Sequence, residues 1–292
     1  MTKKQTNPLR VAYFGTPRFS TFVLDALYEA GYTPTLVVTT PDRPAGRGLQ
    51  LTESPVKKWA LEKEIAVTQP ETLRKESPEL SILKNSEWDL FVVAGYGKIL
   101  PTEIINLPKY GALNVHPSLL PRFRGSSPIE TQILQDEKTI GVSILLMDEE
   151  MDHGPIVAQK SITPETWPMQ ITALENMLWQ AGGSLLVESI PPFIDGSLVP
   201  TPQDHTKATL TKKMEKEDGL INLSDDGYTN YLKFCAYGEW PGTFFFVEKG
   251  GKKIRVKIKD AAFDGQIFLP TIVVPEGKNE QPYSTLLASL QP

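Results

Sequence analysis

Residues 9–40 read LRVAYFGTPRFSTFVLDALYEAGYTPTLVVTT, in which an amphipathic stretch closed by Gly31 separates two apolar runs. This pattern predicts a strand over 9–15, a helix over 19–31 and a second strand over 33–40. Strands that are apolar along their whole length have to be covered on both faces, which is typical of parallel sheets whose connections are helices. The stretch therefore predicts a doubly wound α/β domain.

The same alternation continues through the first 160 residues. Further apolar runs predict strands over 65–69, 89–97, 111–116 and 139–147, and helical stretches lie between most of them, over 56–63, 78–85 and 128–136. A longer helix is expected over 168–190, ended by Pro191 and Pro192. Ligands of such sheets bind at the carboxyl ends of the strands, so the functional residues are expected there. GTPRF after the first run lacks the remaining glycines of GxGxxG, so a dinucleotide site is not expected.

A polar, proline-marked segment over 196–209 predicts a linker between a first domain, 1–195, and a second, 210–292. The second domain holds the short strand-like segments FFFVEKG, KKIRVKIKD and GQIFLPTIVV, as in a small β-barrel. Alternation in KKIRVKIKD puts its cations on one face, which carries Lys253, Arg255, Lys257 and Lys259. This cation stripe is either a solvated strand face or a surface that binds a phosphate backbone.

The composition is that of an ordinary globular protein. The 292 residues are 40% hydrophobic and 22% charged, with a net charge of −5, and no run approaches the roughly 18 apolar residues of a membrane span. The N-terminus lacks the pattern of a signal peptide, so a cytoplasmic protein is expected. The lone Cys235 excludes an intramolecular disulfide, and the three histidines lack metal-ligand spacing, so no metal is predicted.

The segment NVHPSLLPRFRG, residues 114–125, holds the strongest candidates for chemistry. Asn114 and His116 are two apart on a predicted strand, so their side chains share a face. An amide beside an imidazole can polarise a carbonyl, and the carboxylate of Asp152 in MDEEMDHGP can orient the imidazole or take a proton. The set indicates acyl transfer, although His116 alone would equally suit an ordinary strand end. Arg122 and Arg124 are expected to face an anionic ligand.

Several motifs in order resemble the methionyl-tRNA formyltransferase family over nearly the whole chain. They are FGTPRF at 14–19, PDRPAGRG at 41–48, SPVKKWA at 54–60, YGKILP at 96–101, NVHPSLLPRFRG at 114–125 and LTKKMEKEDGLI at 210–221. The resemblance implies a catalytic domain that binds 10-formyltetrahydrofolate and an OB-like C-terminal domain that helps to hold initiator methionyl-tRNA. A monomer is expected, and no cofactor beyond the folate donor is needed.

The resemblance also implies residue roles. Asn114 and His116 would bind and polarise the formyl oxygen, and Asp152 would assist proton removal. The folate site would be formed by two segments, with residues Tyr96, Gly97, Ile99, Leu100, Ser118, Leu119, Leu120 and Pro121. Arg43 would lie on the loop that approaches the acceptor end of the transfer RNA. With Arg47 on the same loop, and with Lys253, Arg255 and Lys257 of the cation stripe expected from strand alternation, it would form the tRNA-binding set.

The sequence departs from the family pattern in three places. Leu49, Gln50 and Leu51 stand where lysines are expected, the segment 275–289 is shorter and less basic, and Glu150 and His153 replace a glycine and a threonine. On an extended strand His153 would point away from Asp152. The alternatives are a sugar-nucleotide N-formyltransferase, a formyltetrahydrofolate hydrolase and an RNA-binding protein without catalysis.

Overall fold

The computed structural model describes residues 9–45, 50–74 and 78–290. Its contacts divide the chain into two compact units. The first contains the N-terminal part to residue 124 together with 141–162 and 176–210, and the second contains 125–140, 163–175 and the C-terminal part from residue 211.

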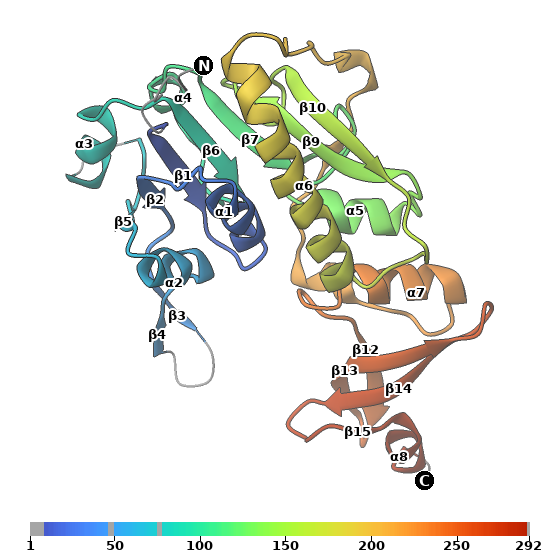
Figure 1. The fold of residues 1–292 in the computed structure, drawn as a ribbon. Helices are drawn as coiled ribbons and strands as arrows, with labels where there is room; N and C mark the ends of the chain where they lie inside the picture. The colour runs from blue at the N-terminus through green and yellow to red at the C-terminus, as the bar shows by residue number, and fades with distance from the viewer. Residues whose placement is uncertain (1–8, 46–49, 75–77, 291–292) are drawn as a thin grey trace. The chain divides into compact units, whose positions relative to one another are not determined.

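The first unit is built on a seven-stranded sheet with the order β10-β9-β7-β6-β1-β2-β5 (Figure 1). Its strands are β1 (Val11–Gly15), β2 (Leu36–Val38), β5 (Ala66–Thr68), β6 (Leu90–Ala94), β7 (Ala112–His116), β9 (Ile140–Leu146) and β10 (Ile156–Ile162). The pairings from β5 to β7 are all parallel, whereas β9 runs antiparallel to β7. The predicted doubly wound, mostly parallel sheet is confirmed. Its order reverses between β1 and β6, and ligands of such sheets bind beside the carboxyl ends at this point.

Helices cover both faces of this sheet. One face packs on α1 (Ser20–Glu29) and α6 (Ile171–Ile194), which lie in front of the strands in Figure 1. Gly182 of α6 lies so close to β7 that an added Cβ would be 2.6 Å from Val115 Cγ1. The opposite face packs Ala12, Phe14 and Phe91 against α3 (Pro78–Lys84) and α4 (Thr102–Ile105). The remaining helix, α2 (Pro55–Glu62), lies beside α1 and β2.

The predicted end of the long helix is wrong. Pro191 and Pro192 lie inside α6, which continues to Ile194. A proline lacks the N–H donor of its own residue but keeps its carbonyl, and here the Asp195 N–H donates to the Pro191 oxygen at 3.1 Å. The last turn therefore forms in spite of both prolines.

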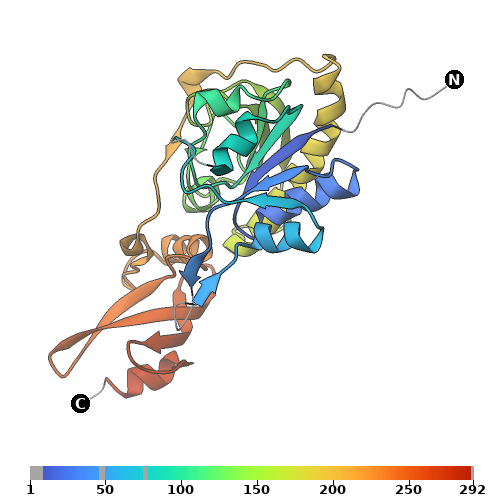
Figure 2. The ribbon, with the colours of Figure 1, turned by 90° about the vertical axis from the view of Figure 1, so that its left-hand side faces the viewer.

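The second unit joins an antiparallel sheet to helices. The sheet order is β12-β13-β14-β15, and the long twisted strands are visible in Figure 2. Its elements are α5 (Pro128–Leu134), α7 (Gly227–Ala236), β12 (Phe244–Lys249), β13 (Lys252–Phe263), β14 (Phe268–Pro275), β15 (Gln281–Pro282) and α8 (Tyr283–Ala288), with the 3-10 turn η2 (Lys216–Gly219) before α7. Phe245, Val256 and Ile258 form its core together with Phe234 of α7. The predicted C-terminal strands are confirmed, while closure into an OB-like barrel stays a prediction.

The observed units differ from the predicted division at 195 and 210. Residues 125–140 and 163–175 group with the C-terminal part because Asp136 connects all three segments. Its Oδ1 accepts hydrogen bonds from Trp167 Nε1 and from the Tyr228 hydroxyl, both at 2.7 Å. The short strands β8 (Arg124–Gly125) and β11 (Leu210–Thr211) mark where the chain passes from one unit to the other.

The segment over 196–209, predicted to be a linker, is part of the first unit. Thr201 exchanges two backbone hydrogen bonds of 2.8 Å with Ile156 at the start of β10, and η1 (His205–Lys207) follows. Within the described ranges, no helix has both the length and the apolar character that crossing a membrane requires.

Candidate active site

The side chains of Asn114, His116 and Asp152 converge at the carboxyl end of β7. Asn114 Nδ2 donates to Asp152 Oδ1 at 3.2 Å, and His116 Nδ1 lies 3.6 Å from the same oxygen. The His116 side chain is almost fully buried. The predicted convergence of an amide, an imidazole and a carboxylate is therefore observed, although their catalytic roles stay a prediction.

The hydrogen bonds of His116 determine which ring nitrogen can accept a proton. Nε2 lies 2.9 Å from the carbonyl oxygen of Phe123, and because that oxygen can only accept, Nε2 carries the hydrogen in the neutral ring. Nδ1 is then an acceptor, and it faces the Asp152 carboxylate. A proton delivered between these two groups would convert them into an imidazolium–carboxylate pair, so together they can take up one proton.

Asp152 lies in a turn that connects β9 to β10. Its φ is +53°, in the left-handed region that few non-glycine residues adopt. The premise that this segment is extended is therefore wrong. His153 is nevertheless directed elsewhere, because its Nδ1 lies 2.7 Å from Asp148 Oδ2 and its ring stacks on that of His205 with centroids 4.1 Å apart.

The turn over 118–121 is held by side chains of β9 and β10. Ser143 Oγ donates to the Ser118 carbonyl at 2.6 Å, and Gln159 Nε2 donates to the Leu120 carbonyl at 2.8 Å. The side chains of Ser118 and Leu120 are buried, whereas Leu119 and Pro121 are half-buried. Ser118 Oγ donates to the Arg122 carbonyl, so the hydrogen of this hydroxyl is already used within the turn.

The segment YGKILP follows β6 directly, so it lies at the same sheet edge as the turn after β7. Tyr96 and Leu100 belong to the buried core, whereas Ile99 is 69% exposed and Gly97 is exposed with a φ of +27°. Lys98 fixes the segment, because its Nζ donates to the carbonyls of Pro70 and Glu71 at 2.6 and 2.8 Å. The Tyr96 hydroxyl is buried and has no hydrogen-bond partner among the described residues.

The arginines predicted to bind anions have different surroundings. Arg43 is exposed on β3 (Arg43–Ala45), which pairs antiparallel with β4 (Gln50–Thr52), and Arg47 lies outside the described residues. The expectation for Arg124 is wrong. Its side chain is buried, and its guanidinium binds Gln203 and His205 within the first unit.

The cation stripe of β13 has the predicted alternation. Lys253, Arg255 and Lys257 pair with Glu248, Phe246 and Phe244 of β12, so these six side chains share a face opposite the core. Lys259 sits at a register shift of the pairing with β14. Lys253 Nζ lies 4.3 Å from the centre of the Phe246 ring, and Arg255 Cζ lies 3.8 Å from that of Phe244.

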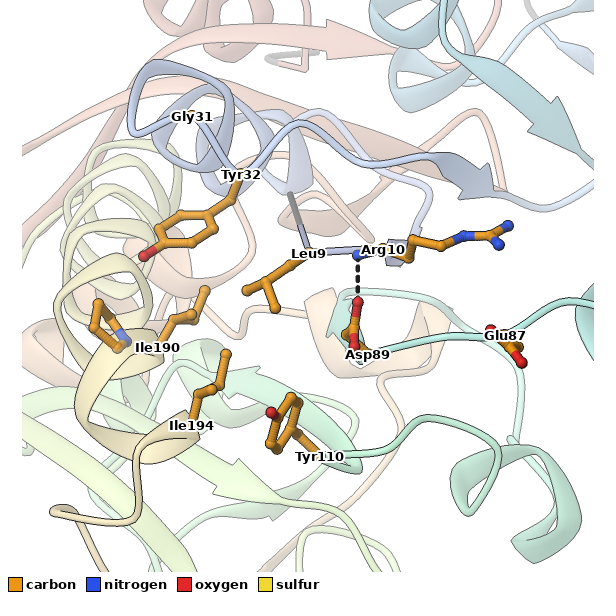
Figure 3. A pocket seen from close by; sticks show the side chains of 10 residues that line it. Leu9, Arg10, Gly31, Tyr32, Glu87, Asp89, Tyr110, Ile190 and Ile194 are labelled. Carbon is orange, nitrogen blue, oxygen red and sulfur yellow. Dashed lines mark hydrogen bonds between the residues drawn. The ribbon is translucent and has the colours of Figure 1, made fainter. Parts of the chain in front are cut away.

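A surface groove of about 830 Å³ is not lined by any of the three converging side chains; Figure 3 shows the residues that do line it. It is lined by Leu9, Arg10, Gly31, Tyr32, Glu87, Asp89, Tyr110, Ile190, Pro191 and Ile194. Residues 10, 89 and 110 lie one or two positions before β1, β6 and β7, so the groove opens at the amino ends of these strands. It is therefore not the predicted site.

Within the described ranges no three His, Cys, Asp or Glu residues are grouped to hold a metal ion.

The fold and the convergence of an amide, an imidazole and a carboxylate suit an acyl-group transferase. A family model described as "Formyl transferase" matches residues 9–190, which narrows the class to formyltransferases. The chain is 38% identical over 271 residues to a methionyl-tRNA formyltransferase of Dictyoglomus thermophilum, covering 92% of this chain and 86% of that protein. It is 39% identical over 272 residues to one of Chloroflexus aurantiacus, with the same coverage. The chain belongs to the methionyl-tRNA formyltransferase family.

Among solved structures, HypX from Aquifex aeolicus in complex with tetrahydrofolic acid aligns with a TM-score of 0.63. The alignment covers 97% of this chain and 48% of that one at 18% identity, so the likeness concerns the fold.

Proposed function

We propose that this chain transfers the formyl group of 10-formyltetrahydrofolate to the α-amine of the methionine esterified to initiator tRNA, in translation initiation. The convergence of Asn114, His116 and Asp152 at a strand end, in a chain of this family, carries the proposal. The protein would act as a monomer in the cytoplasm, where initiator tRNA is charged.

The three side chains suit the proton and charge movements of this reaction. When the neutral amine adds to the formyl carbon, the carbonyl oxygen becomes negative and the nitrogen positive. Asn114 has a second amide hydrogen that can bind the oxygen, while the His116–Asp152 pair takes the surplus proton from the nitrogen. The carbon–nitrogen bond to the donor then breaks, and the donor nitrogen leaves with a proton from the same pair. Each of these contributions is typically worth about 10² to 10⁴ in rate.

The donor would bind where YGKILP and the turn over 118–121 meet at the sheet edge. A flat heterocycle is best held by a few placed polar groups in an apolar slot. The buried Tyr96 hydroxyl fits such a group, because buried hydroxyls nearly always have a partner and this one has none among the described residues. Ile99 of the same segment supplies exposed apolar surface. Ser118 and Leu120 would contribute by shaping the turn that carries the half-buried Leu119 and Pro121, since their side chains are buried and their backbone N–H groups already donate to His116 and Ser143.

Ile99→Asp should weaken donor binding about tenfold, because the charge would lose hydration against an apolar ring; tenfold corresponds to about 1.4 kcal/mol. Calorimetric titration with tetrahydrofolate measures the effect. Ile82→Asp is the matched control, since Ile82 is an isoleucine of α3 that is 48% exposed. Equal affinities of the Ile99→Asp variant and the unmodified chain would place the donor elsewhere. Ile99 is a better site for this change than Leu120, where a buried charge would disturb folding.

The acceptor would be held by exposed cations of each unit, Arg43 in the first and the cation stripe in the second. Cations beside aromatic rings are typical of surfaces that bind phosphates and stack on bases. Phe246 is 39% exposed between Lys253 and Arg255. The Arg255 Nε is buried and lacks a hydrogen-bond partner within the described part of the chain. An OB-like closure of this domain would present the stripe on a barrel wall.

The Lys253→Glu, Lys257→Glu double variant should bind methionyl-tRNA more weakly and with a shallower salt dependence. Each lost phosphate contact reduces the slope of log affinity against log salt by roughly 0.7 to 0.9. Filter binding between 50 and 200 mM salt measures the slope. The matched control reverses Lys249 and Lys278, exposed lysines of the same unit that are off the stripe. An unchanged slope would make the stripe a solvated strand face.

The proposed activity is tested by offering the purified chain a labelled formyl donor with one of three acceptors. Formylation of charged initiator tRNA at a rate far above that of the others is the expected result. Preferred formylation of a 4-amino sugar nucleotide, or release of formate in water alone, would instead establish one of the two alternative activities. Binding of tRNA without formyl transfer would indicate the non-catalytic alternative.

A further inference from the structure

We infer that Gln203 is a positioning residue for Asp152, holding the turn that presents the carboxylate to His116. The inference rests on the proposed function, because it assumes that Asp152 takes part in proton removal. Gln203 lies in the segment over 196–209, far from Asp152 along the chain, and it makes no contact with the Asp152 carboxylate among the hydrogen bonds observed.

Gln203 binds the backbone of the turn on both sides of His153. Its Nε2 donates to the carbonyl oxygen of Asp152 at 2.8 Å and to that of Gly154 at 2.7 Å. Both hydrogens of one amide are thus used to bridge two carbonyls of the same turn. The Gln203 side chain is 5% exposed, so water cannot easily replace these bonds.

The other end of the Gln203 amide is fixed by a buried cation. Gln203 Oε1 accepts from Arg124 Nε at 3.1 Å and from an Arg124 terminal nitrogen at 2.7 Å. Arg124 follows Phe123, whose carbonyl accepts from His116 Nε2. The same short segment therefore orients the imidazole through Phe123 and the carboxylate turn through Arg124 and Gln203.

A second set of contacts holds the beginning of the turn. An Arg124 terminal nitrogen lies 2.9 Å from His205 Nδ1, and the His205 ring stacks on His153 at an interplanar angle of 5°. His153 in turn binds Asp148. Both ends of the turn are thus connected to Arg124. Asp148 is connected through the two histidines, and the carbonyls of Asp152 and Gly154 are connected through Gln203.

These bonds have a physical purpose at Asp152. A non-glycine residue at a φ of +53° costs about 1 to 3 kcal/mol and persists only when its surroundings hold it. Without the Gln203 amide, the turn could relax and move the carboxylate away from Nδ1 of His116. A displacement of about 1 Å at a reacting group can cost on the order of 10² in rate.

Gln203→Glu isolates the two donors, because glutamate keeps the acceptor oxygens for Arg124 and removes both N–H groups. The variant should lower kcat by about 10-fold to 10²-fold, with KM for both substrates within about twofold. The same change in the Asp152→Asn background should lower kcat by less than about twofold, since a positioning residue loses its effect when the group it positions is already inactive. If the glutamate variant does not fold, Gln203→Met is compared with and without Asp152→Asn in the same way.

Gln132→Glu is the matched control, because Gln132 is also buried and its Nε2 donates to a backbone carbonyl, that of Pro128 in α5. It should lower the thermal midpoint without changing kcat at a temperature where the protein stays folded. An equal loss of kcat by Gln203→Glu with and without Asp152→Asn would show a general structural role and overturn the inference, as would unchanged kcat. This comparison of the four variants can be made with whichever acceptor the chain formylates. A wrong assignment of the acceptor is therefore distinguished from a wrong assignment of Gln203.

Discussion

Asp152→Asn should lower the turnover number by at least about 10²-fold, with the thermal midpoint unchanged. The substitution keeps the shape of the side chain but removes the carboxylate that faces His116 Nδ1 at 3.6 Å and would stabilise the imidazolium. An amide there cannot stabilise an imidazolium, so the surplus proton of the reaction intermediate has no acceptor pair. Single-turnover formylation of methionyl-tRNA at saturating donor measures the chemical step directly.

Glu149→Gln is the appropriate comparison, since it neutralises an exposed carboxylate in the same turn. This variant should retain the turnover of the unmodified chain. If Asp152→Asn also stayed within about threefold of it, proton removal would have to be assigned to His116 alone. Donor affinity should be the same in both variants, because neither side chain belongs to the proposed folate slot.

Gly154→Ala should reduce both stability and turnover. An added Cβ would lie 1.9 Å from the Leu146 carbonyl oxygen and 3.1 Å from its carbon, so backbone would have to move. Overpacking of this kind typically costs about 1 to 3 kcal/mol and sometimes more, which corresponds to roughly 5 °C or more in thermal midpoint. Because Gln203 binds the Gly154 carbonyl as well as that of Asp152, turnover should fall by about 10² in the molecules that remain folded.

Gly238→Ala provides the control for this glycine. A Cβ at Gly238 would meet its nearest atoms at 3.4 Å, which is ordinary van der Waals contact. Calorimetric midpoints and turnover of the two variants should therefore differ clearly. A Gly154→Ala variant as stable and active as the Gly238→Ala variant would show that the turn can move without moving Asp152.

The chemistry of the site could be predicted in part because its first two members are close in sequence. Asn114 and His116 share a face through strand alternation alone, which needs no tertiary information. The position of Asp152 could be anticipated from the family pattern, but its left-handed backbone could not, since the expectation of an extended segment there was wrong. Arg124 also differed from expectation, because a charged residue in a polar segment gives no local sign that it will be buried.

Periodicity in the chain was sufficient for six of the seven strands of the sheet, for most of its covering helices and for the cation stripe, because strand and helix repeats follow from backbone geometry at each residue. It did not predict the edge strand β10 or the short helix α4. The role of Gln203 depended on folding. Its segment carries the prolines and polar residues of a linker, and only the pairing of Thr201 with Ile156 brings its amide to the Asp152 turn. Local sequence encodes local conformation, whereas hydrogen bonds between residues about 50 apart exist only once packing has brought their atoms within 3 Å.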